Sequence, residues 1–350
     1  MTSKVFLEDI EYIASSDEIR WTDMRNSAVL ITGATGLIGY ALVHALSAAN
    51  DKHKLNLRII AHGRNAEKGE ALVRECGIRF ISGDIREPML SDELPETIDY
   101  IVHGAAVTKS ADMVANPVGV MTTAFDGTRN ILEQAKERHC KSLVYLSSME
   151  VYGQTELKEV AESDLGYLDL SNIRSSYPES KRLCENMCAA YAAQYGVPAK
   201  VARLAQTFGA GTSRSDTRVF AQFARNAIAN QDIELHTEGK SRGNYCYTAD
   251  TIRALLLIML DGKYGEAYNV ANHGASTTIR EMAELVADDV CGGTIKVVVS
   301  IPEDIHKRGY APVVSHSLNT DKLKALGWIP RYGLADMYRR IIVDWKEGIL

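Results

Sequence analysis

The sequence predicts an α/β fold, in which a doubly wound parallel sheet is followed by a smaller lobe. Three observations support this prediction. Short apolar runs alternate with segments of helical periodicity through the first 205 residues. The joints between them are short and contain glycine, as in βαβ units whose right-handed crossovers place helices on both faces of a sheet. Past residue 205 the alternation gives way to stretches rich in glycine, serine and charge, which indicates a second lobe.

The expected elements follow in chain order. Residues 1–26 form a helical arm, which we expect to pack on the sheet. Residues 27–205 form the sheet domain, to which parts of 243–272 return, and residues 206–350 form mainly the substrate-binding lobe. Helical spacing is found at Leu37–Ala49 and Ala66–Cys76. The expected strands are Ala28–Thr32, Leu57–Ala61, Arg79–Ile81, Tyr100–His103, Ser142–Ser147 and Lys200–Leu204.

Composition narrows the class of protein. The 350 residues are 46% hydrophobic and 24% charged, which is ordinary for a globular chain with a core. The formal net charge of −6 provides no field that would recruit nucleic acid, although local arginines can still bind an anion. The N-terminus carries acids throughout, so we expect neither a signal peptide nor a membrane span, and we expect the cytoplasm. The six cysteines form no CxxC pair. We expect Cys184 and Cys188 to be buried on one helix face, and we expect no metal site.

A glycine-rich loop predicts a dinucleotide site. The segment VLITGATGLIG, Val29–Gly39, ends a strand and begins a helix. Gly33 allows the turn, Gly36 allows the backbone to approach a pyrophosphate, and Gly39 allows the helix to pack on the strand. The helix N-terminus then offers free N–H groups to the phosphates. The residues expected to contact the cofactor here are Gly33, Thr35, Gly36, Leu37, Ile38 and Gly39.

The second expected strand leaves the choice of dinucleotide open. An acid at its end would hold the adenosine ribose and repel a 2′-phosphate. The sequence reads IIAHGRN at Ile59–Asn65, with no carboxylate and with Arg64 close by. NAD and NADP therefore both remain as candidates. Asp84 is a candidate partner for the adenine amino group, the alternative being that it caps the following turn.

A second group of residues indicates acid–base chemistry. Tyr177 and Lys181 are four residues apart, so on a helix they lie on one face. A neighbouring ammonium lowers a tyrosine pKa and suits the phenol to proton transfer. Ser147, Ser148 and Glu150 follow another expected strand, at the sheet edge where ligands bind. Ser148 is a candidate to hold a substrate oxygen, and Glu150 is a second candidate for proton transfer.

Taken together, the motifs resemble the extended short-chain dehydrogenase/reductases that act as NAD-dependent sugar-nucleotide epimerases, dehydratases and decarboxylases. The resemblance covers roughly residues 27–345 and implies a Rossmann-type sheet. It also implies that Ile85, Ala105 and Ala106 contact the cofactor and that Lys181 holds the nicotinamide ribose. It rests on TGATGLIG, on GDI at Gly83–Ile85, HGAA at His103–Ala106, SSMEVYG, YPESK and LKALGWIPRYGL at Leu323–Leu334.

Departures from the family pattern refine the expected reaction. The triplet Ser148-Met149-Glu150 is similar to the Thr-x-Glu of the enzymes that decarboxylate UDP-glucuronate. Met149 cannot protonate a leaving hydroxyl, which argues against a 4,6-dehydratase. Relatives carry an arginine where this chain has Gly243, a role that Arg242 could take through a small loop shift. Gln206 stands where many relatives have asparagine. The candidates for contact with the diphosphate are Arg214, Arg218, Lys240 and Arg242.

The resemblance implies a redox-neutral cycle on a nucleotide-diphosphate sugar. Tyr177 would take a proton from a sugar hydroxyl while NAD⁺ accepts the hydride, and Ser148 would polarise the ketone that forms. Glu150 would assist the later step. Two alternatives stay open: a net NADP(H)-dependent oxidoreductase acting on a keto-sugar or another carbonyl, and a non-catalytic dinucleotide sensor. Relatives usually pair through two helices, so segments 118–138 and 178–195 predict a homodimer.

Overall fold

A seven-stranded parallel sheet forms the larger part of the molecule. The computed structural model describes residues 2–89, 94–302 and 314–348. Neighbouring strands follow the order β11-β7-β5-β4-β1-β2-β3. Their bounds are β1 Ala28–Thr32, β2 Arg58–Gly63, β3 Arg79–Ser82, β4 Tyr100–His103, β5 Ser142–Ser148, β7 Ala199–Leu204 and β11 Ala267–Val270. The predicted α/β class is therefore confirmed, and β11 shows how residues beyond 205 return to the sheet.

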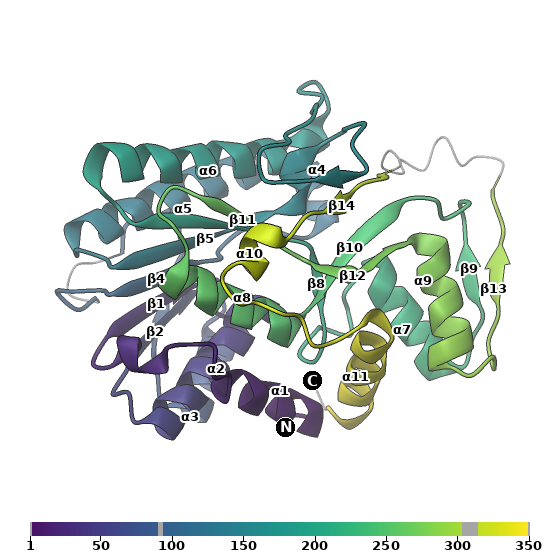
Figure 1. Ribbon diagram of the computed structural model, residues 1–350, viewed down its shortest axis with the longest axis horizontal. Coiled ribbons are helices and arrows are strands. Elements are labelled where there is room, and N and C mark those ends of the chain that lie inside the picture. Colours follow the sequence, from purple (N-terminus) through teal and green to yellow (C-terminus); the bar gives the residue numbers. More distant parts are fainter. Residues whose placement is uncertain (1, 90–93, 303–313, 349–350) are drawn as a thin grey trace.

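Helices cover both faces of this sheet (Figure 1). One face carries α5 (Pro117–Glu137) and α6 (Ser176–Tyr195), and the other carries α2 (Leu37–His53), α3 (Ala66–Cys76) and α8 (Thr248–Asp261). Because both faces are covered, β1 and β4 are buried along their whole length, which explains why they read as apolar runs. The chain leaves β1 toward β2 on one side and enters β4 on the other. This change of direction is the topological switch point at which ligands bind.

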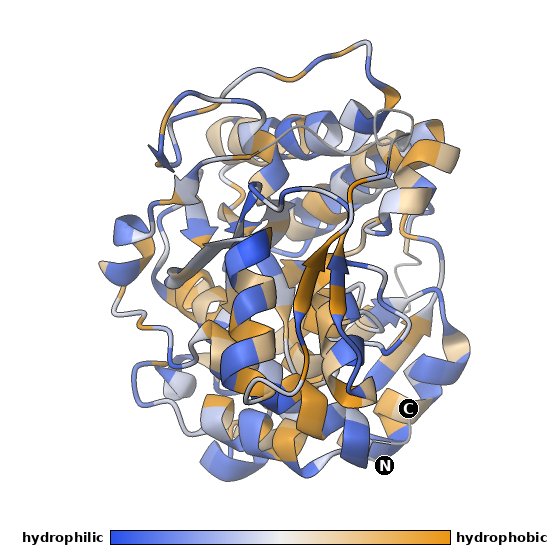
Figure 2. Ribbon diagram, turned by 90° about the vertical axis from the view of Figure 1, so that its right-hand side faces the viewer, coloured by the Kyte–Doolittle hydropathy of each residue, from blue (hydrophilic) through white to orange (hydrophobic). Residues whose placement is uncertain are grey.

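The smaller lobe is built from short strands and four further helices. A three-stranded sheet of order β12-β10-β8 joins it to the larger part. Figure 2 looks onto this lobe, where the apolar strands β9 and β13 pair in parallel. The bounds are β8 Gln206–Phe208, β9 Ile233–Leu235, β10 Arg242–Tyr247, β12 Asn272–Thr278, β13 Val297–Val299, α7 Val219–Ala229, α9 Ile279–Leu285, α10 Asp321–Lys324 and α11 Leu334–Glu347. Further short elements are α4 Ser110–Ala115, β6 Glu159–Val160, β14 Ser317–Leu318, two 3₁₀ turns at Met149–Tyr152 and Ile173–Ser175, and a π-helical turn at Val286–Val290.

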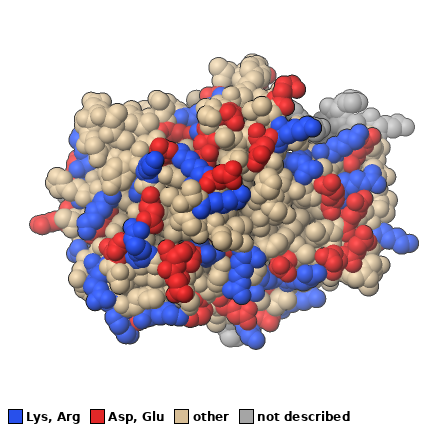
Figure 3. All heavy atoms as spheres, viewed as in Figure 1, with Lys and Arg blue, Asp and Glu red and all other residues tan. Residues whose placement is uncertain are grey.

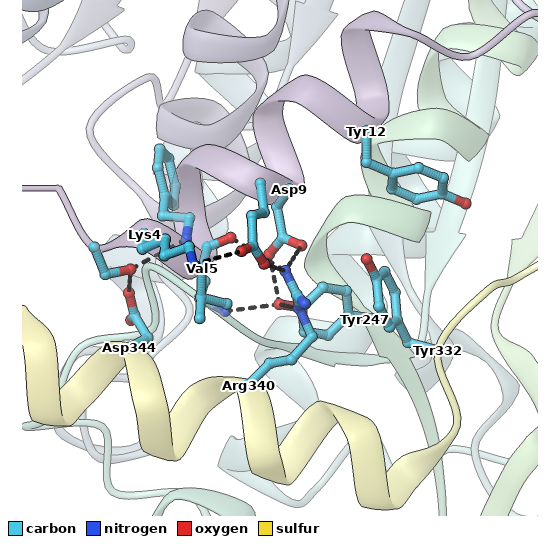
Figure 4. A network of polar contacts seen from close by, with 12 residues as sticks. Lys4, Val5, Asp9, Tyr12, Tyr247, Tyr332, Arg340 and Asp344 are labelled. Atoms are coloured by element: carbon cyan, nitrogen blue, oxygen red, sulfur yellow. Dashed lines mark hydrogen bonds and ion pairs between the residues drawn. The ribbon is translucent and has the colours of Figure 1, made fainter.

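The N-terminal arm packs differently from our expectation. Helix α1 (Lys4–Ala14) is followed by a single 3₁₀ turn at Trp21–Met24. Its main contacts are with helices α2, α8 and α11, so it covers helices instead of the sheet itself. The two ends of the described chain lie side by side, and polar residues of α1 and α11 point toward one another (Figures 1 and 4).

Burial and surface charge agree with a globular chain. All six cysteines are free, and Cys184 and Cys188 are buried on α6. In the face shown in Figure 3, lysines and arginines are interspersed with aspartates and glutamates. Within the described ranges, no helix combines the length and the apolar character needed to cross a membrane.

Candidate active site

A cavity of about 580 Å³ opens at the carboxyl end of the sheet, beside the switch point. Every residue predicted to bind the cofactor or to act in catalysis lines it. The glycine loop and the N-terminus of α2 form one wall, and Ser148, Glu150, Tyr177 and Lys181 form another. The fold therefore brings segments from positions 33 to 218 around a single space.

The loop after β1 leaves room for a charged group to approach its backbone closely. Gly33 has φ +71°, a conformation that other residues rarely adopt. A Cβ on Gly39 would lie only 2.4 Å from the carbonyl oxygen of Gly33, so any side chain would push the helix away from the turn. Gly36 precedes α2 in extended conformation and leaves the free N–H groups of the helix facing the cavity. These features fit a dinucleotide pyrophosphate.

A buried pair holds the neighbouring loop in place. The side-chain oxygen of Thr32 lies 2.7 Å from Nδ1 of His103 and accepts a hydrogen bond from the Ala105 N–H at 3.3 Å. Burial lowers the pKa of His103 to about 3, so the ring is neutral. The pair fixes the path of Ala105 and Ala106 along the cavity wall.

Tyr177 and Lys181 lie one turn apart on α6, and both face the cavity. The Lys181 ammonium donates to the carbonyl oxygen of Leu146 at 2.6 Å, and burial lowers its pKa to about 8. Burial and the charge of Glu150 together raise the pKa of Tyr177 to about 12, against a hydrogen bond with Ser148 that lowers it. The phenol is therefore protonated near neutral pH, beside a hydroxyl that can share its proton.

Glu150 is held by an arginine that the sequence analysis did not single out. Arg174 contacts its two carboxylate oxygens at 3.0 and 2.9 Å. The guanidinium carbon of Arg174 also lies 5.7 Å from the ring centre of Tyr177. A signal was present in the sequence, because Arg174 precedes Tyr177 by three residues and so reaches the same side of a helical turn. His62, which also lines the cavity, was missed as well.

Two of the predicted substrate contacts reach the cavity from the smaller lobe. Arg218 precedes α7 and is paired with Asp216, its Nη2 lying 2.6 Å from a carboxylate oxygen. Arg218 also donates to Gln206 at 3.4 Å, so both side chains lie opposite Tyr177 in the lining of the cavity. Arg218 is therefore the predicted diphosphate ligand that is best placed for that role.

Other predicted substrate contacts lie elsewhere. Ser147 lines the cavity, but its hydroxyl donates to Glu185 at 2.5 Å and is not free for a ligand. Arg214 does not line the cavity, because its guanidinium donates to the carbonyl oxygen of Gly348. Arg242 lies in β10 opposite β12, where it donates to the carbonyl oxygen of Ser276. Lys240 forms an exposed ion pair with Glu238. The small loop shift that would bring Arg242 to the cavity is therefore not seen.

The fold and the cavity define a class: an enzyme of the short-chain dehydrogenase/reductase type, with a dinucleotide loop, a Tyr–Lys pair and a serine around one space. Residues 29–271 match the NAD dependent epimerase/dehydratase family, to which this chain belongs. Similar proteins include UDP-glucuronic acid decarboxylase 6 of Arabidopsis thaliana, 28% identical over 89% of this chain and 86% of that protein. UDP-glucuronic acid decarboxylase 1 of Xenopus tropicalis is 27% identical over 92% and 72%.

Solved structures agree on the fold. UDP-N-acetylglucosamine 4-epimerase from Methanobrevibacter ruminantium aligns with a TM-score of 0.77 at 21% identity, over 92% of this chain and 99% of that chain. A dTDP-glucose 4,6-dehydratase from Streptomyces venezuelae, crystallised with NAD, aligns with a TM-score of 0.75 at 23% identity, over 92% and 97%. The chain is thus an NAD-dependent enzyme of this family, and the shape of its glycine loop fits that cofactor.

Proposed function

We propose that the chain oxidises C4 of a nucleotide-diphosphate hexuronate and decarboxylates the 4-keto sugar that results. The observation that carries the proposal is Glu150, a carboxylate held by Arg174 beside Tyr177 in the cavity. A simple 4-epimerase has no need of this second acid–base group. The similarity to UDP-glucuronic acid decarboxylases also supports this proposal.

The residues of the chain would act in the following way. NAD, held by the glycine loop and Lys181, would supply the hydride acceptor for C4 and would leave the net redox state of the sugar unchanged over the whole cycle. Tyr177 acts as the base in its phenolate form, a minor population at neutral pH because its pKa is raised to about 12, and takes the C4 hydroxyl proton; Ser148 donates a hydrogen bond to the ketone oxygen that forms. The C5–C6 bond then breaks, CO₂ leaves, and its electron pair delocalises onto O4 as an enolate that Tyr177 and Ser148 stabilise. Glu150 would transfer a proton from solvent to C5 after CO₂ has left. Arg218 binds the diphosphate of the substrate.

A second candidate is 4-epimerisation without loss of carbon. It is favoured by the surroundings of Arg242, whose guanidinium contacts Ser276 and lies 3.7 Å from Glu281. With glycine at position 243, the smaller lobe presents no cation in the place where relatives carry an arginine. A C6 carboxylate would then depend on Arg218, or the substrate would lack one.

One experiment distinguishes the two. Freshly purified protein is denatured and the released small molecules are identified by mass spectrometry; near-stoichiometric NAD is expected. The native protein is then incubated with UDP-glucuronate and followed by NMR. Decarboxylation gives a UDP-pentose and bicarbonate, whereas epimerisation gives UDP-galacturonate. The decarboxylase assignment would be overturned if the protein carries NAD and converts a neutral UDP-hexose but leaves UDP-glucuronate unchanged.

We also propose that the chain forms a homodimer through α5 and α6. Val118, Met121 and Phe125 form an exposed apolar stripe on α5, and Leu183 is exposed on α6. Light scattering is expected to give a dimer, and replacement of Met121 and Phe125 by glutamate is expected to give a monomer. Leu7→Glu on α1 serves as the control for an exposed leucine outside this stripe. A dimer that persists in the double variant would exclude this interface.

The proposed compartment is the cytoplasm. Six free cysteines, four of them buried, are compatible with a reducing environment, in which disulfides are rare. Microscopy of a fluorescent fusion in the source cell would test this location.

A further inference from the structure

The end of β2 forms the part of the cavity where an adenosine ribose would lie. His62 and Gly63 close this strand, and Arg64 follows directly. The carbonyl oxygen of His62 accepts from the Ala34 N–H at 3.1 Å, so the strand end lies against the glycine turn. Residues 62–65 all line the cavity. Whatever ribose substituent a dinucleotide carries would therefore meet these four residues.

The charges at this strand end differ from those of a site that selects NAD. In such sites a carboxylate at the end of the second strand binds the ribose hydroxyls and repels a 2′-phosphate. Residues 62–65 contain no carboxylate. The nearby Asp84 is an anion whose charge is compensated by Arg86, which donates to its two oxygens at 3.1 and 2.7 Å. The repulsion that excludes a 2′-phosphate from such sites is therefore weakened here.

Arg64 adds an attraction. It lines the cavity and is exposed, and within the described ranges it has no hydrogen bond or ion pair. It lies close enough to Asp84 for its charge to lower the pKa of that carboxyl. The adjacent Asn65 is engaged, since its side chain accepts from the Lys68 N–H and caps α3. A free guanidinium beside the ribose position is the group best suited to bind a phosphate.

We propose that the adenosine-ribose end of this cavity binds a 2′-phosphate through Arg64, so that the chain accepts NADP(H) as well as NAD. The inference concerns the cofactor end and goes beyond the proposed sugar chemistry. Three features support this binding: residues 62–65 line the cavity, Arg86 compensates the charge of Asp84, and Arg64 has no hydrogen bond or ion pair within the described ranges.

Calorimetry on the full-length protein, freed of bound nucleotide, tests the proposal with two pairs of ligands. Adenosine 2′,5′-bisphosphate is compared with 5′-AMP, and NADP⁺ with NAD⁺. The wild-type protein is expected to bind the 2′-phosphorylated member of each pair at least as tightly as the other. Arg64→Gln is expected to weaken it about tenfold or more, the range for a lost hydrogen bond to a charged group, and to leave 5′-AMP and NAD⁺ within about twofold.

Two further variants sharpen the result. Arg64→Asp places a carboxylate near the ribose, so it is expected to abolish binding of NADP⁺ while NAD⁺ still binds. Lys68→Gln removes an exposed cation from α3 that does not line the cavity, and its affinities are expected to equal those of the wild type.

The proposal is overturned if the wild-type protein binds NAD⁺ but not NADP⁺, or if Lys68→Gln weakens NADP⁺ as much as Arg64→Gln does. Neither result depends on turnover of any sugar. A protein that fails to convert UDP-glucuronate, yet binds NADP⁺ through Arg64, would refute the proposed function and leave this inference standing.

Discussion

Two regions of the molecule contain the same three chemical groups in different settings. Tyr177 and Glu150 line the cavity and Arg174 pairs with Glu150 behind them; the contact between the N-terminal arm and the last helix contains a tyrosine, an aspartate and an arginine. At the cavity, the tyrosine and the carboxylate border an open space. In the arm every one of them bonds to the other two, and protein surrounds them.

The arm network is closed on itself (Figure 4). Tyr247, at the end of β10, donates to Asp9 of α1 at 2.5 Å. Arg340 of α11 donates to Asp9 at 2.7 Å and to the Tyr247 oxygen at 3.0 Å. Burial raises the pKa of Asp9 to about 6, despite the hydrogen bond from Tyr247 and the charge of Arg340. The network ties three distant segments of the chain together and offers nothing to a ligand.

The comparison teaches that residue types alone do not make a site. Tyr177 and Tyr247 are both buried and both have a raised pKa. Only Tyr177 lines the cavity, where a substrate hydroxyl can reach it. The hydroxyl of Tyr247 is already shared between a carboxylate and a guanidinium. A perturbed pKa indicates function only when the group also faces a space in which chemistry can occur.

Replacing Tyr177 or Tyr247 by phenylalanine should show the largest difference in kcat between the cavity and the arm network. Tyr177→Phe removes the group that transfers the proton, so kcat is expected to fall about 10²- to 10⁴-fold. Tyr247→Phe should retain kcat and lose about 1–3 kcal/mol of unfolding free energy, because it removes the donor to one carboxylate oxygen of the buried Asp9 and leaves only Arg340 bound to that carboxylate. Turnover assays and urea unfolding measure the two effects. If kcat falls equally in both variants, Tyr247 matters for turnover as much as Tyr177 does, and the distinction between a catalytic and a structural tyrosine is wrong.

The arginines of α11 test the closed network in a second way. Arg340→Met leaves Asp9 buried without its cation and is expected to cost about 3–5 kcal/mol of unfolding free energy at pH 8. Arg339→Met is the control, since the ion pairs of Arg339 with Asp289 and Asp336 are exposed and their loss should cost less than about 1 kcal/mol.

The cost of Arg340→Met should depend on pH in a defined direction. The folded-state pKa of Asp9 is raised to about 6, from 3.8, so Asp9 stabilises the fold below about pH 4 and this stabilisation is lost as pH rises through 6. Removal of Arg340 raises the Asp9 pKa further, so the cost should grow above pH 6 and shrink at pH 5. Urea unfolding at pH 5 and pH 8 measures it. A cost that is equal at both pH values would mean that Arg340 contributes through packing alone.

Features of the fold and site that depend on residues close together in the sequence could be predicted from the sequence, and those that depend on distant partners could not. The glycine loop, β1 and α3 depend on local periodicity and turn chemistry, and the structure has β1 and α3 at the predicted residues. Parallel strands end at one edge, which is why residues as distant as Gly33 and Tyr177 could be assigned to one space. The directions of Arg214 and Arg242 depend on partners far away in the sequence, Gly348 for the first and a neighbouring strand for the second. No local pattern encodes them.

The smallest of the expected effects concerns Arg174, the cavity counterpart of Arg340. Its charge lowers the pKa of Tyr177, whereas Glu150 raises it. Arg174→Met removes the cation and leaves the carboxylate facing the phenol, so the Tyr177 pKa should rise and the acid limb of the kcat profile should move to higher pH. One pKa unit corresponds to about a tenfold loss of rate on that limb. Arg174→Lys keeps the charge and should restore the position of the limb. If kcat of Arg174→Met falls while the acid limb of its pH profile stays in place, Arg174 acts only by holding the loop that carries Glu150. Its role would then be structural, like that of Arg340 in the arm network.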